Sequence, residues 1–294
     1  MNSSKTALLI DSGCDLSNEL ISRYDIKVAR LTIIYPEKVY ADGQDIEPET
    51  VYERFPGTIP KTSLPGIQDV LDILHSIREE GYENVIGITI SSGLSGTFNA
   101  IRLAFEEQTQ LKTFAFDTKN ISIGSGIYAV WAAQKLEEGW SFEDTVRGLE
   151  NKIHDSKLFY YMDTLDYLAK GGRITPSIAI VGKILHLKPI ISCNDDGIYY
   201  TVAKIRGAAK GLSKLLELEV QAASEMKGTI WASVMSGGTS TDPTGRLKEQ
   251  VLSARKMLLE KLPNVKIVLE KQITASMAIH TGPGLIGISL FAAD

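Results

Sequence analysis

Strand-like and helix-like hydrophobic patterns alternate along the first half of the chain. Short apolar runs predict strands at residues 6–10, 26–34, 84–90 and 112–116. Apolar residues at helical spacing predict helices near residues 17–24, 67–80, 98–108, 123–138 and 142–153. In the 67–80 segment one face is apolar, with Ile67, Val70, Leu71, Leu74 and Ile77. This alternation predicts an α/β fold with a parallel sheet.

The second half repeats the mixture of strands and helices. Strands are predicted at residues 157–162, 187–193, 229–234, 265–270 and 285–290, and helices at 176–185, 207–226 and 243–260. The sequence Asp195-Asp196-Gly197 is typical of a tight hairpin turn. We therefore predict two α/β lobes, residues 1–155 and 156–294.

Composition narrows the class of protein. The chain has 294 residues, 44% of them hydrophobic, which is enough for two substantial cores. Its net charge of −5 argues against general nucleic-acid binding. No stretch approaches the roughly 18 apolar residues of a membrane span, and the apolar run near the start is too short for a signal peptide, so we expect a cytoplasmic protein without membrane insertion. Cys14 and Cys193 are far apart and are predicted to be free thiols, with no metal site.

Positive charge is concentrated between residues 166 and 214. Eight basic residues stand there against three acidic ones: Lys170, Arg173, Lys183, Lys188, Lys204, Arg206, Lys210 and Lys214 against Asp166, Asp195 and Asp196. Such a face suits an acidic or phosphorylated partner, although a solvated face without a partner has the same composition.

Small and hydroxyl residues gather where a predicted strand meets a helix, in the sequence Ile90-Ser91-Ser92-Gly93-Leu94-Ser95-Gly96-Thr97. The first N–H groups of a helix lack intrahelical partners and carry partial positive charge. Ser95 and Gly96 are therefore candidates to bind a carboxylate or phosphate. Thr62 and Ser63 precede another predicted helix start, at residue 67, in the same way, with simple helix capping as the alternative.

A second unusual stretch is His280-Thr281-Gly282-Pro283-Gly284. Its glycines and proline predict a tight loop that approaches a ligand closely. The imidazole of His280 is a candidate donor to a carboxylate, with a purely structural histidine as the alternative.

The sequence also offers two weaker candidates, a catalytic serine and a phosphate-binding loop. The sequence around Ser95 nearly matches a hydrolase nucleophile elbow but has Thr97 where that motif needs glycine. A triad with His280 and either Asp11 or Asp117 is conceivable, but sequence spacing does not establish it. The loop Ser236-Gly237-Gly238-Thr239 is a weak candidate for a phosphate cradle, and the usual ATP and dinucleotide motifs are missing.

Several ordered motifs together resemble the DegV family, which includes the fatty-acid-binding subunits of bacterial fatty acid kinase. The resemblance runs almost end to end and rests on eight stretches, at residues 11–16, 40–43, 62–65, 91–97, 117–126, 168–174, 187–190 and 280–284. The family often has glutamine where Leu64 stands.

The resemblance implies an α/β fold of two lobes, each a largely parallel sheet flanked by helices. It implies a non-catalytic carrier without a cofactor, whose first lobe holds the acyl chain of a long-chain fatty acid in a buried tunnel. Thr62, Ser63, Ser95, Gly96 and His280 would bind the carboxylate. Arg173 and Arg206 would bind the ATP-using kinase subunit, which converts the acid to acyl phosphate for phospholipid synthesis.

Overall fold

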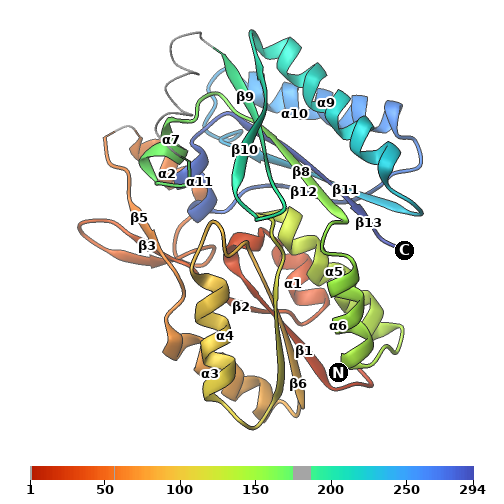
Figure 1. The fold of residues 1–294 in the computed structure, drawn as a ribbon. Helices are drawn as coiled ribbons and strands as arrows, with labels where there is room; N and C mark the ends of the chain where they lie inside the picture. Colours follow the sequence, from red (N-terminus) through yellow and green to blue (C-terminus); the bar gives the residue numbers. More distant parts are fainter. Residues whose placement is uncertain (1, 56, 175–186) are drawn as a thin grey trace. The chain divides into compact units, whose positions relative to one another are not determined.

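The computed structural model describes residues 2–55, 57–174 and 187–294 (Figure 1). Contacts between residues divide the chain into two compact units. Unit 1 comprises residues 1–32, 63–154 and 195–198, and unit 2 comprises residues 33–62, 155–194 and 199–294. The predicted helix at 176–185 lies outside the described residues.

Unit 1 is built on a four-stranded parallel sheet in the order β2-β1-β6-β7. Its strands are β1 (Thr6–Asp11), β2 (Lys27–Ala29), β6 (Asn84–Thr89) and β7 (Lys112–Asp117). Its helices are η1 (Ser12–Cys14), α1 (Asn18–Arg23), α3 (Ile67–Glu79), α4 (Thr97–Glu107), α5 (Ile123–Glu137) and α6 (Phe142–Asn151). Helices α3 and α4 lie on one side of the sheet, and α5 and α6 lie on the other (Figure 1). The predicted parallel α/β arrangement is confirmed for this unit.

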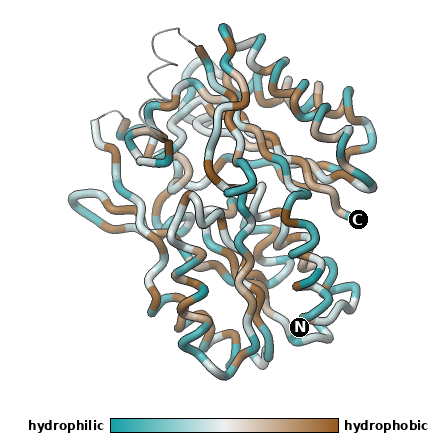
Figure 2. Tube along the Cα trace, in the orientation of Figure 1, coloured by the Kyte–Doolittle hydropathy of each residue, from teal (hydrophilic) through white to brown (hydrophobic). Residues whose placement is uncertain are grey.

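The core of unit 1 follows the predicted hydrophobic stripes. Val70, Leu74 and Ile77 of α3 are buried, whereas Ile67, at the start of the helix, is 44% exposed. Strand β6 carries Gly87 because α4 packs closely on it: a Cβ there would lie 2.8 Å from the ring of Phe105. The hydropathy colouring shows hydrophobic residues along the central strands (Figure 2).

Unit 2 contains a six-stranded sheet in the order β10-β9-β8-β13-β11-β12. The strands are β8 (Ser156–Tyr161), β9 (Lys188–Cys193), β10 (Tyr199–Ile205), β11 (Ile230–Gly237), β12 (Lys266–Gln272) and β13 (Leu285–Ala292). Only the β11–β12 pairing is parallel within the described residues. The expectation of a largely parallel sheet is therefore wrong for this unit. The β9–β10 hairpin is one physical reason, because strands joined by a tight turn must run antiparallel.

Helices α9 (Ala208–Glu225) and α10 (Arg246–Lys261) pack on one face of the unit 2 sheet. Two shorter helices, α7 (Asp166–Lys170) and α11 (Ala275–Thr281), pack against each other. The sequence pattern did not predict α7 or α11, because short helices carry too few residues to show a period. Strand β10 follows the predicted hairpin turn at residues 195–197.

The segment from residue 33 to residue 62 belongs with unit 2, which differs from the predicted division into residues 1–155 and 156–294. It contains α2 (Pro48–Arg54) and most of a small sheet of β4 (Val39–Ala41), β3 (Thr32–Ile34) and β5 (Lys61–Ser63). Helix α2 packs on α11, and these long-range contacts join the segment to unit 2. The chain passes from unit 1 to unit 2 between His154 and Asp155.

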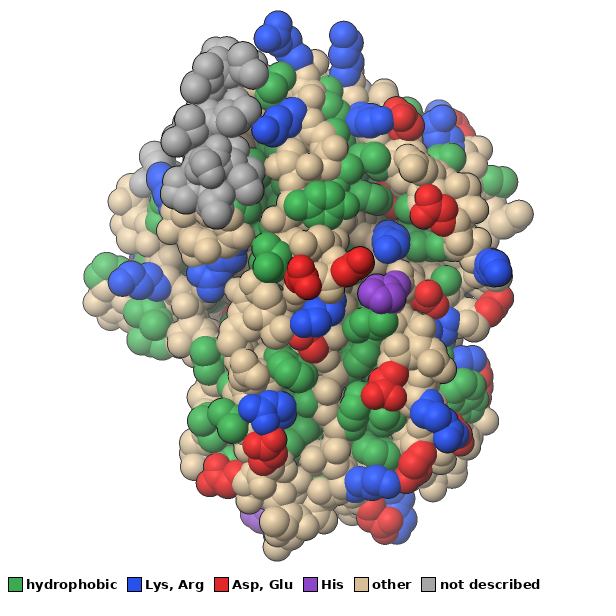
Figure 3. All heavy atoms as spheres, in the orientation of Figure 1, with side chains coloured by type: hydrophobic (Ala, Val, Ile, Leu, Met, Phe, Trp, Pro, Cys, Tyr) green, Lys and Arg blue, Asp and Glu red, His purple; other side chains and the backbone are tan. Residues whose placement is uncertain are grey.

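Acidic and basic side chains are interspersed over much of the visible face (Figure 3). No described helix is both long enough and apolar enough to cross a bilayer. Cys14 and Cys193 are free thiols, as predicted, and burial raises the pKa of Cys193 to about 12.

Candidate functional site

The serine loop, residues 90–97, connects β6 to α4 in unit 1 and holds its hydroxyls in fixed positions. The Ser95 hydroxyl lies 2.7 Å from that of Thr97 and accepts a hydrogen bond from the Thr97 amide. Helix α4 has Gly96 as its N-cap and no side-chain cap. Leu64 packs here too, since a Cβ on Gly96 would lie 3.2 Å from its side chain. Ser95 and Gly96 therefore lie at the start of α4, and a helix start here was predicted.

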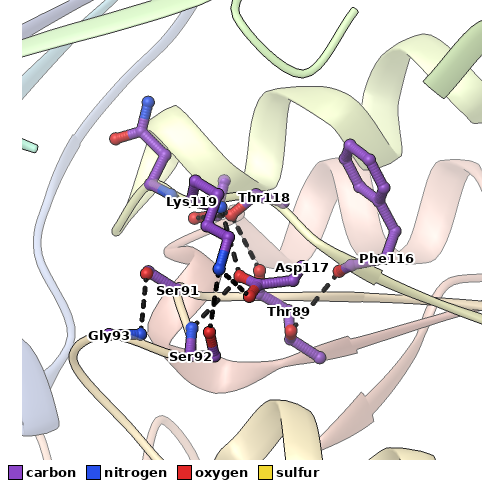
Figure 4. A network of polar contacts seen from close by, with 10 residues as sticks. Thr89, Ser91, Ser92, Gly93, Phe116, Asp117, Thr118 and Lys119 are labelled. Atoms are coloured by element: carbon purple, nitrogen blue, oxygen red, sulfur yellow. Dashed lines mark hydrogen bonds and ion pairs between the residues drawn. The ribbon is translucent and has the colours of Figure 1, made fainter. Parts of the chain in front are cut away.

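A polar network behind this loop fixes its backbone (Figure 4). The Asp117 carboxylate accepts a hydrogen bond from the amide of Ser92 and forms a 2.8 Å ion pair with Lys119. Lys119 also donates to the Ser92 hydroxyl. Burial alone would raise the pKa of Asp117, but the hydrogen bonds from Lys119 and Ser92 outweigh it and hold the pKa below its usual value.

Asp11 supports the same loop from the end of β1. One carboxylate oxygen accepts from the amide of Gly13 at 2.9 Å, and the other accepts from the amide of Ile90 at 2.9 Å. The carboxylate is fully buried. Asp11 is thus a structural acceptor for backbone groups, which does not favour the conceivable role of orienting a catalytic histidine.

The tip of the hairpin between β9 and β10 packs on the serine loop as part of unit 1. A Cβ on Gly93 would lie 2.9 Å from the carbonyl oxygens of Asp196 and Gly197. A Cβ on Gly197, which has φ of +75°, would lie 1.9 Å from the hydroxyl oxygen of Ser91. Gly93 is required because two backbones approach each other closely, and Gly197 is required because its φ is positive and the Ser91 hydroxyl occupies the space of a Cβ.

The other candidate residues meet in unit 2. The hydroxyl of Thr62, in β5, lies 2.8 Å from Nε2 of His280, in α11, although 218 positions separate them in sequence. Thr62 and Ser63 do not cap the following helix, because the N-cap of α3 is Gly66 and has no side-chain hydrogen bond. The capping alternative is therefore wrong for these two residues.

His280 is held in place from two sides. Asp42 accepts hydrogen bonds from the amide and hydroxyl of Ser276 in the first turn of α11, and so anchors the helix that carries the imidazole. On the other side, a Cβ on Gly171 would lie only 2.3 Å from Nδ1 of His280. Arg173 donates a hydrogen bond to the carbonyl of Gly171. Asp42 and Gly171 were absent from the predicted site residues, although both fall within the motifs of the resemblance.

The imidazole of His280 is neutral at physiological pH. Burial, with a smaller contribution from the positive charge of Arg173, lowers its pKa to about 3. Nδ1 is buried and has no hydrogen-bond partner among the described residues. A neutral ring can donate through one nitrogen and accept through the other, so this group can bind a further polar atom.

The structure thus brings together Thr62 and His280 in unit 2, and Ser95, Gly96 and the neighbourhood of Ser63 in unit 1. Arg206, which directly follows β10, is exposed. Arg173 is half-buried, and burial lowers its pKa. Arg173 therefore acts electrostatically on His280, a role that the sequence did not suggest.

Comparison with known proteins identifies the family. A family model described as "Uncharacterised protein, DegV family" matches residues 5–293. This chain belongs to the DegV family. A DegV domain-containing protein of Clostridium acetobutylicum is 38% identical over 287 residues, which is 98% of this chain and 99% of the relative.

Solved structures share the fold over almost the whole chain. A DegV family protein from Thermus thermophilus, described as binding fatty acid, has 28% identity and a TM-score of 0.88, covering 99% of this chain and 100% of its own. A stearic acid-binding protein from Eubacterium ventriosum has 28% identity and a TM-score of 0.86, covering 98% of each chain. The resemblance predicted from the sequence motifs is confirmed.

Proposed function

We propose that this DegV protein is a carrier that binds a long-chain fatty acid. The Thr62–His280 pair is the observation that carries the proposal, because it combines a hydroxyl with a neutral, partly buried imidazole whose buried Nδ1 is unpaired among the described residues. Solved relatives that bind fatty acids give independent support.

The carboxylate is the part of the ligand that these groups suit. Thr62 and His280 would bind it together with Ser63, Ser95 and Gly96. An unpaired carboxylate that leaves water costs several kcal/mol or more, and hydroxyl, amide and imidazole donors offset that cost. His280 contributes hydrogen bonding without charge, and the nearby Arg173 supplies positive potential.

The acyl chain would supply most of the affinity. Burying about fourteen methylenes contributes on the order of 10 kcal/mol, at roughly 0.8 kcal/mol each. We propose, as the family resemblance implies, that unit 1 holds the chain in a tunnel.

We further propose that the protein acts in the cytoplasm and presents the carboxylate to an ATP-using fatty acid kinase, without catalysis of its own. Holding the acid by hydrogen bonds leaves an oxygen available for phosphoryl transfer. Arg206 is exposed and suits contact with this partner. Substitution of Arg173 would be a less selective test of that contact, because the charge of Arg173 also lowers the pKa of His280.

The competing function is a serine hydrolase or acyltransferase that uses Ser95 and His280. The described contacts do not favour it: Ser95 is hydrogen bonded to Thr97, His280 to Thr62, and Asp11 to backbone amides. Labelling of Ser95 by an active-site serine probe, or ester hydrolysis lost in Ser95→Ala, would support this alternative.

Lipid binding is tested by native mass spectrometry of the purified protein before and after organic extraction. We expect an added mass equal to that of a long-chain fatty acid, which extraction removes.

Thr62→Val and His280→Gln should each reduce retention of added palmitate by about tenfold, as expected for the loss of one hydrogen bond to a charged group. Loss of retention in neither variant would overturn the head-group assignment.

Matched variants separate binding from folding. Thr201→Val changes another partly buried strand threonine, and His75→Gln changes an exposed histidine on α3, so neither should alter retention.

For the kinase, Arg206→Glu should abolish acyl phosphate formation while palmitate retention persists. Loss of both properties would indicate misfolding, and loss of neither would contradict the proposed partner surface.

A further inference from the structure

Glu49, in the first turn of α2, ties the segment of residues 33–62 to distant parts of unit 2. Its Oε1 atom accepts one hydrogen bond from the side-chain amide of Gln272, at 2.7 Å, and another from the Ser240 hydroxyl. These partners lie 223 and 191 positions away in the sequence. Burial alone would raise the pKa of Glu49, but its hydrogen bonds outweigh burial and hold the pKa below its usual value. Glu49 is therefore a charged acceptor at neutral pH.

Gln272, at the end of β12, uses both ends of its side-chain amide. Its nitrogen donates to Glu49, and its oxygen accepts from the backbone amides of Gly238 and Thr239, at 3.1 Å each. The reverse orientation would set the NH₂ group against two donors and the oxygen against a carboxylate, so the amide has one favourable orientation. Both backbone amides are occupied, and the weak expectation that the loop of residues 236–239 binds phosphate through them is therefore wrong.

The loop of residues 236–239 is also hydrogen bonded on both sides of α11, the helix that carries the imidazole. Before the helix, the amide of Ile273 donates to the carbonyl of Ser236 at 2.9 Å. After the helix, the amide of Gly284 donates to the carbonyl of Gly237 at 2.8 Å. Because one loop is bonded at both ends of α11, the place of the helix depends on the place of the loop.

Helix α2 holds this loop through two side chains. It lies beside α11 (Figure 1). The ring of Tyr52 packs on the loop, since a Cβ on Gly237 would lie 2.8 Å from the Tyr52 hydroxyl oxygen. Glu49 and Tyr52 are three positions apart, which places them on the same side of the helix. Loss of the Glu49–Gln272 contact should therefore shift the loop and α11 with it.

We propose that Glu49 and Gln272 are positioning residues that set the place of His280. Neither is hydrogen bonded to the imidazole, which lies 2.8 Å from the Thr62 hydroxyl; they act through the loop and α11. The proposal deepens the proposed function and rests on it for its consequence, because the imidazole is the group that would bind the fatty acid carboxylate. Binding groups must be held to within about 0.5 Å of their working geometry, so a small shift of α11 weakens binding.

The first test is Gln272→Glu, which removes the amide donor and sets a second carboxylate against Glu49. Like charges at this separation repel each other. Retention of added palmitate at neutral pH should fall by about tenfold. In the protein without added lipid, the nitrogen-15 magnetic resonance signals of the His280 ring should shift. Glu49→Leu removes the acceptor without adding charge, and should shift the same signals and reduce retention by about threefold.

The second test exchanges the two side chains, by combining Glu49→Gln with Gln272→Glu. The new amide at position 49 can donate to the new carboxylate at position 272, which still accepts from Gly238 and Thr239. Palmitate retention and the His280 ring signals should return to those of the parent. A merely destabilising effect of Gln272→Glu would not be reversed by a second substitution at Glu49.

Two matched variants control for charge alone. Gln221→Glu adds the same charge at an exposed position on α9, and Glu53→Gln removes an exposed carboxylate from α2. Neither should alter palmitate retention or the His280 ring signals. Urea denaturation of every variant shows that folded proteins are being compared.

Two outcomes would overturn the proposal. One is that Gln272→Glu and Glu49→Leu leave the His280 ring signals unchanged. The other is a loss that the exchanged pair does not reverse, or that Gln221→Glu reproduces. Failure of the parent to retain palmitate would contradict the proposed function instead, because the ring signals report the place of His280 without lipid.

Discussion

The two units differ in how completely their buried polar groups are hydrogen bonded. In unit 1, the buried Asp11 and the half-buried Asp117 accept hydrogen bonds from backbone amides, and no buried side-chain donor or acceptor of the described residues lacks a partner. In unit 2, His280 Nδ1, the Tyr161 hydroxyl and both oxygens of Glu219 are buried without a hydrogen bond to a described residue. Unit 1 therefore uses polar contacts to fix loops, whereas unit 2 retains capacity for other groups.

The largest expected effect breaks the satisfied network of unit 1. Asp11→Ala removes the acceptor of two buried amides, those of Gly13 and Ile90. Each unsatisfied buried donor costs about 1–3 kcal/mol, so the free energy of unfolding should fall by about 4 kcal/mol. Urea denaturation measures the loss. Asp11→Asn keeps one carbonyl acceptor and should lose less; equal stability of all three proteins would contradict the structural role.

The next effect has the opposite sign and lies in unit 2. Glu219 is fully buried on the apolar side of α9, and burial raises the pKa of its carboxyl. Glu219→Leu should raise the free energy of unfolding by about 2 kcal/mol, since a buried polar group without a hydrogen bond to any described residue is removed.

The pH dependence of the Glu219→Leu effect sharpens this prediction. Because the folded pKa of Glu219 lies above the unfolded value of 4.5, the unfolded state releases its proton first as pH rises. The gain in Glu219→Leu should therefore be larger at pH 7 than at pH 4. A loss of stability on substitution would show that the carboxyl has a partner in solution.

Features set by neighbouring residues could be predicted from the sequence, whereas contacts between residues far apart in the chain could not. Most strands and helices of unit 1 follow from the hydrophobic period, but the single strand expected at residues 26–34 is two short strands, β2 and β3, and η1 was not predicted. Ser95 was identified as a candidate from its place between a strand and a helix, which are β6 and α4. The Thr62–His280 contact spans 218 positions, and only the family resemblance pointed to it. Satisfied and unsatisfied burial depends on tertiary packing, so neither Tyr161 nor Glu219 stood out.

Protonation of His280, in unit 2, should make the stability of the protein depend on pH. Its folded pKa of about 3 is below the unfolded value of 6.5, so the unfolded state binds a proton first as pH falls. Stability should fall by up to about 1.4 kcal/mol per pH unit between pH 6.5 and 3 because of this residue. In His280→Gln that contribution should be missing from urea denaturation curves; an unchanged slope would contradict a buried neutral imidazole.

The smallest expected effect concerns the Asp117–Lys119 ion pair. Its lysine is partly exposed, so Lys119→Gln should cost no more than about 1 kcal/mol. The pair should matter less in high salt. Urea denaturation at low and high ionic strength checks this, with Lys135→Gln on α5 as a control for an exposed pair. A cost above that of Asp11→Ala would reverse the proposed order of contributions within unit 1.

The central claim is that a neutral His280 binds the carboxylate of a fatty acid. The most direct measurement is nitrogen-15 magnetic resonance of the His280 ring, titrated with palmitate labelled with carbon-13 at the carboxyl, at neutral pH. We predict that the ring stays neutral, that its nitrogen signals shift on saturation, and that the bound carboxyl signal moves in His280→Gln. Unchanged ring signals at full lipid occupancy would contradict the account.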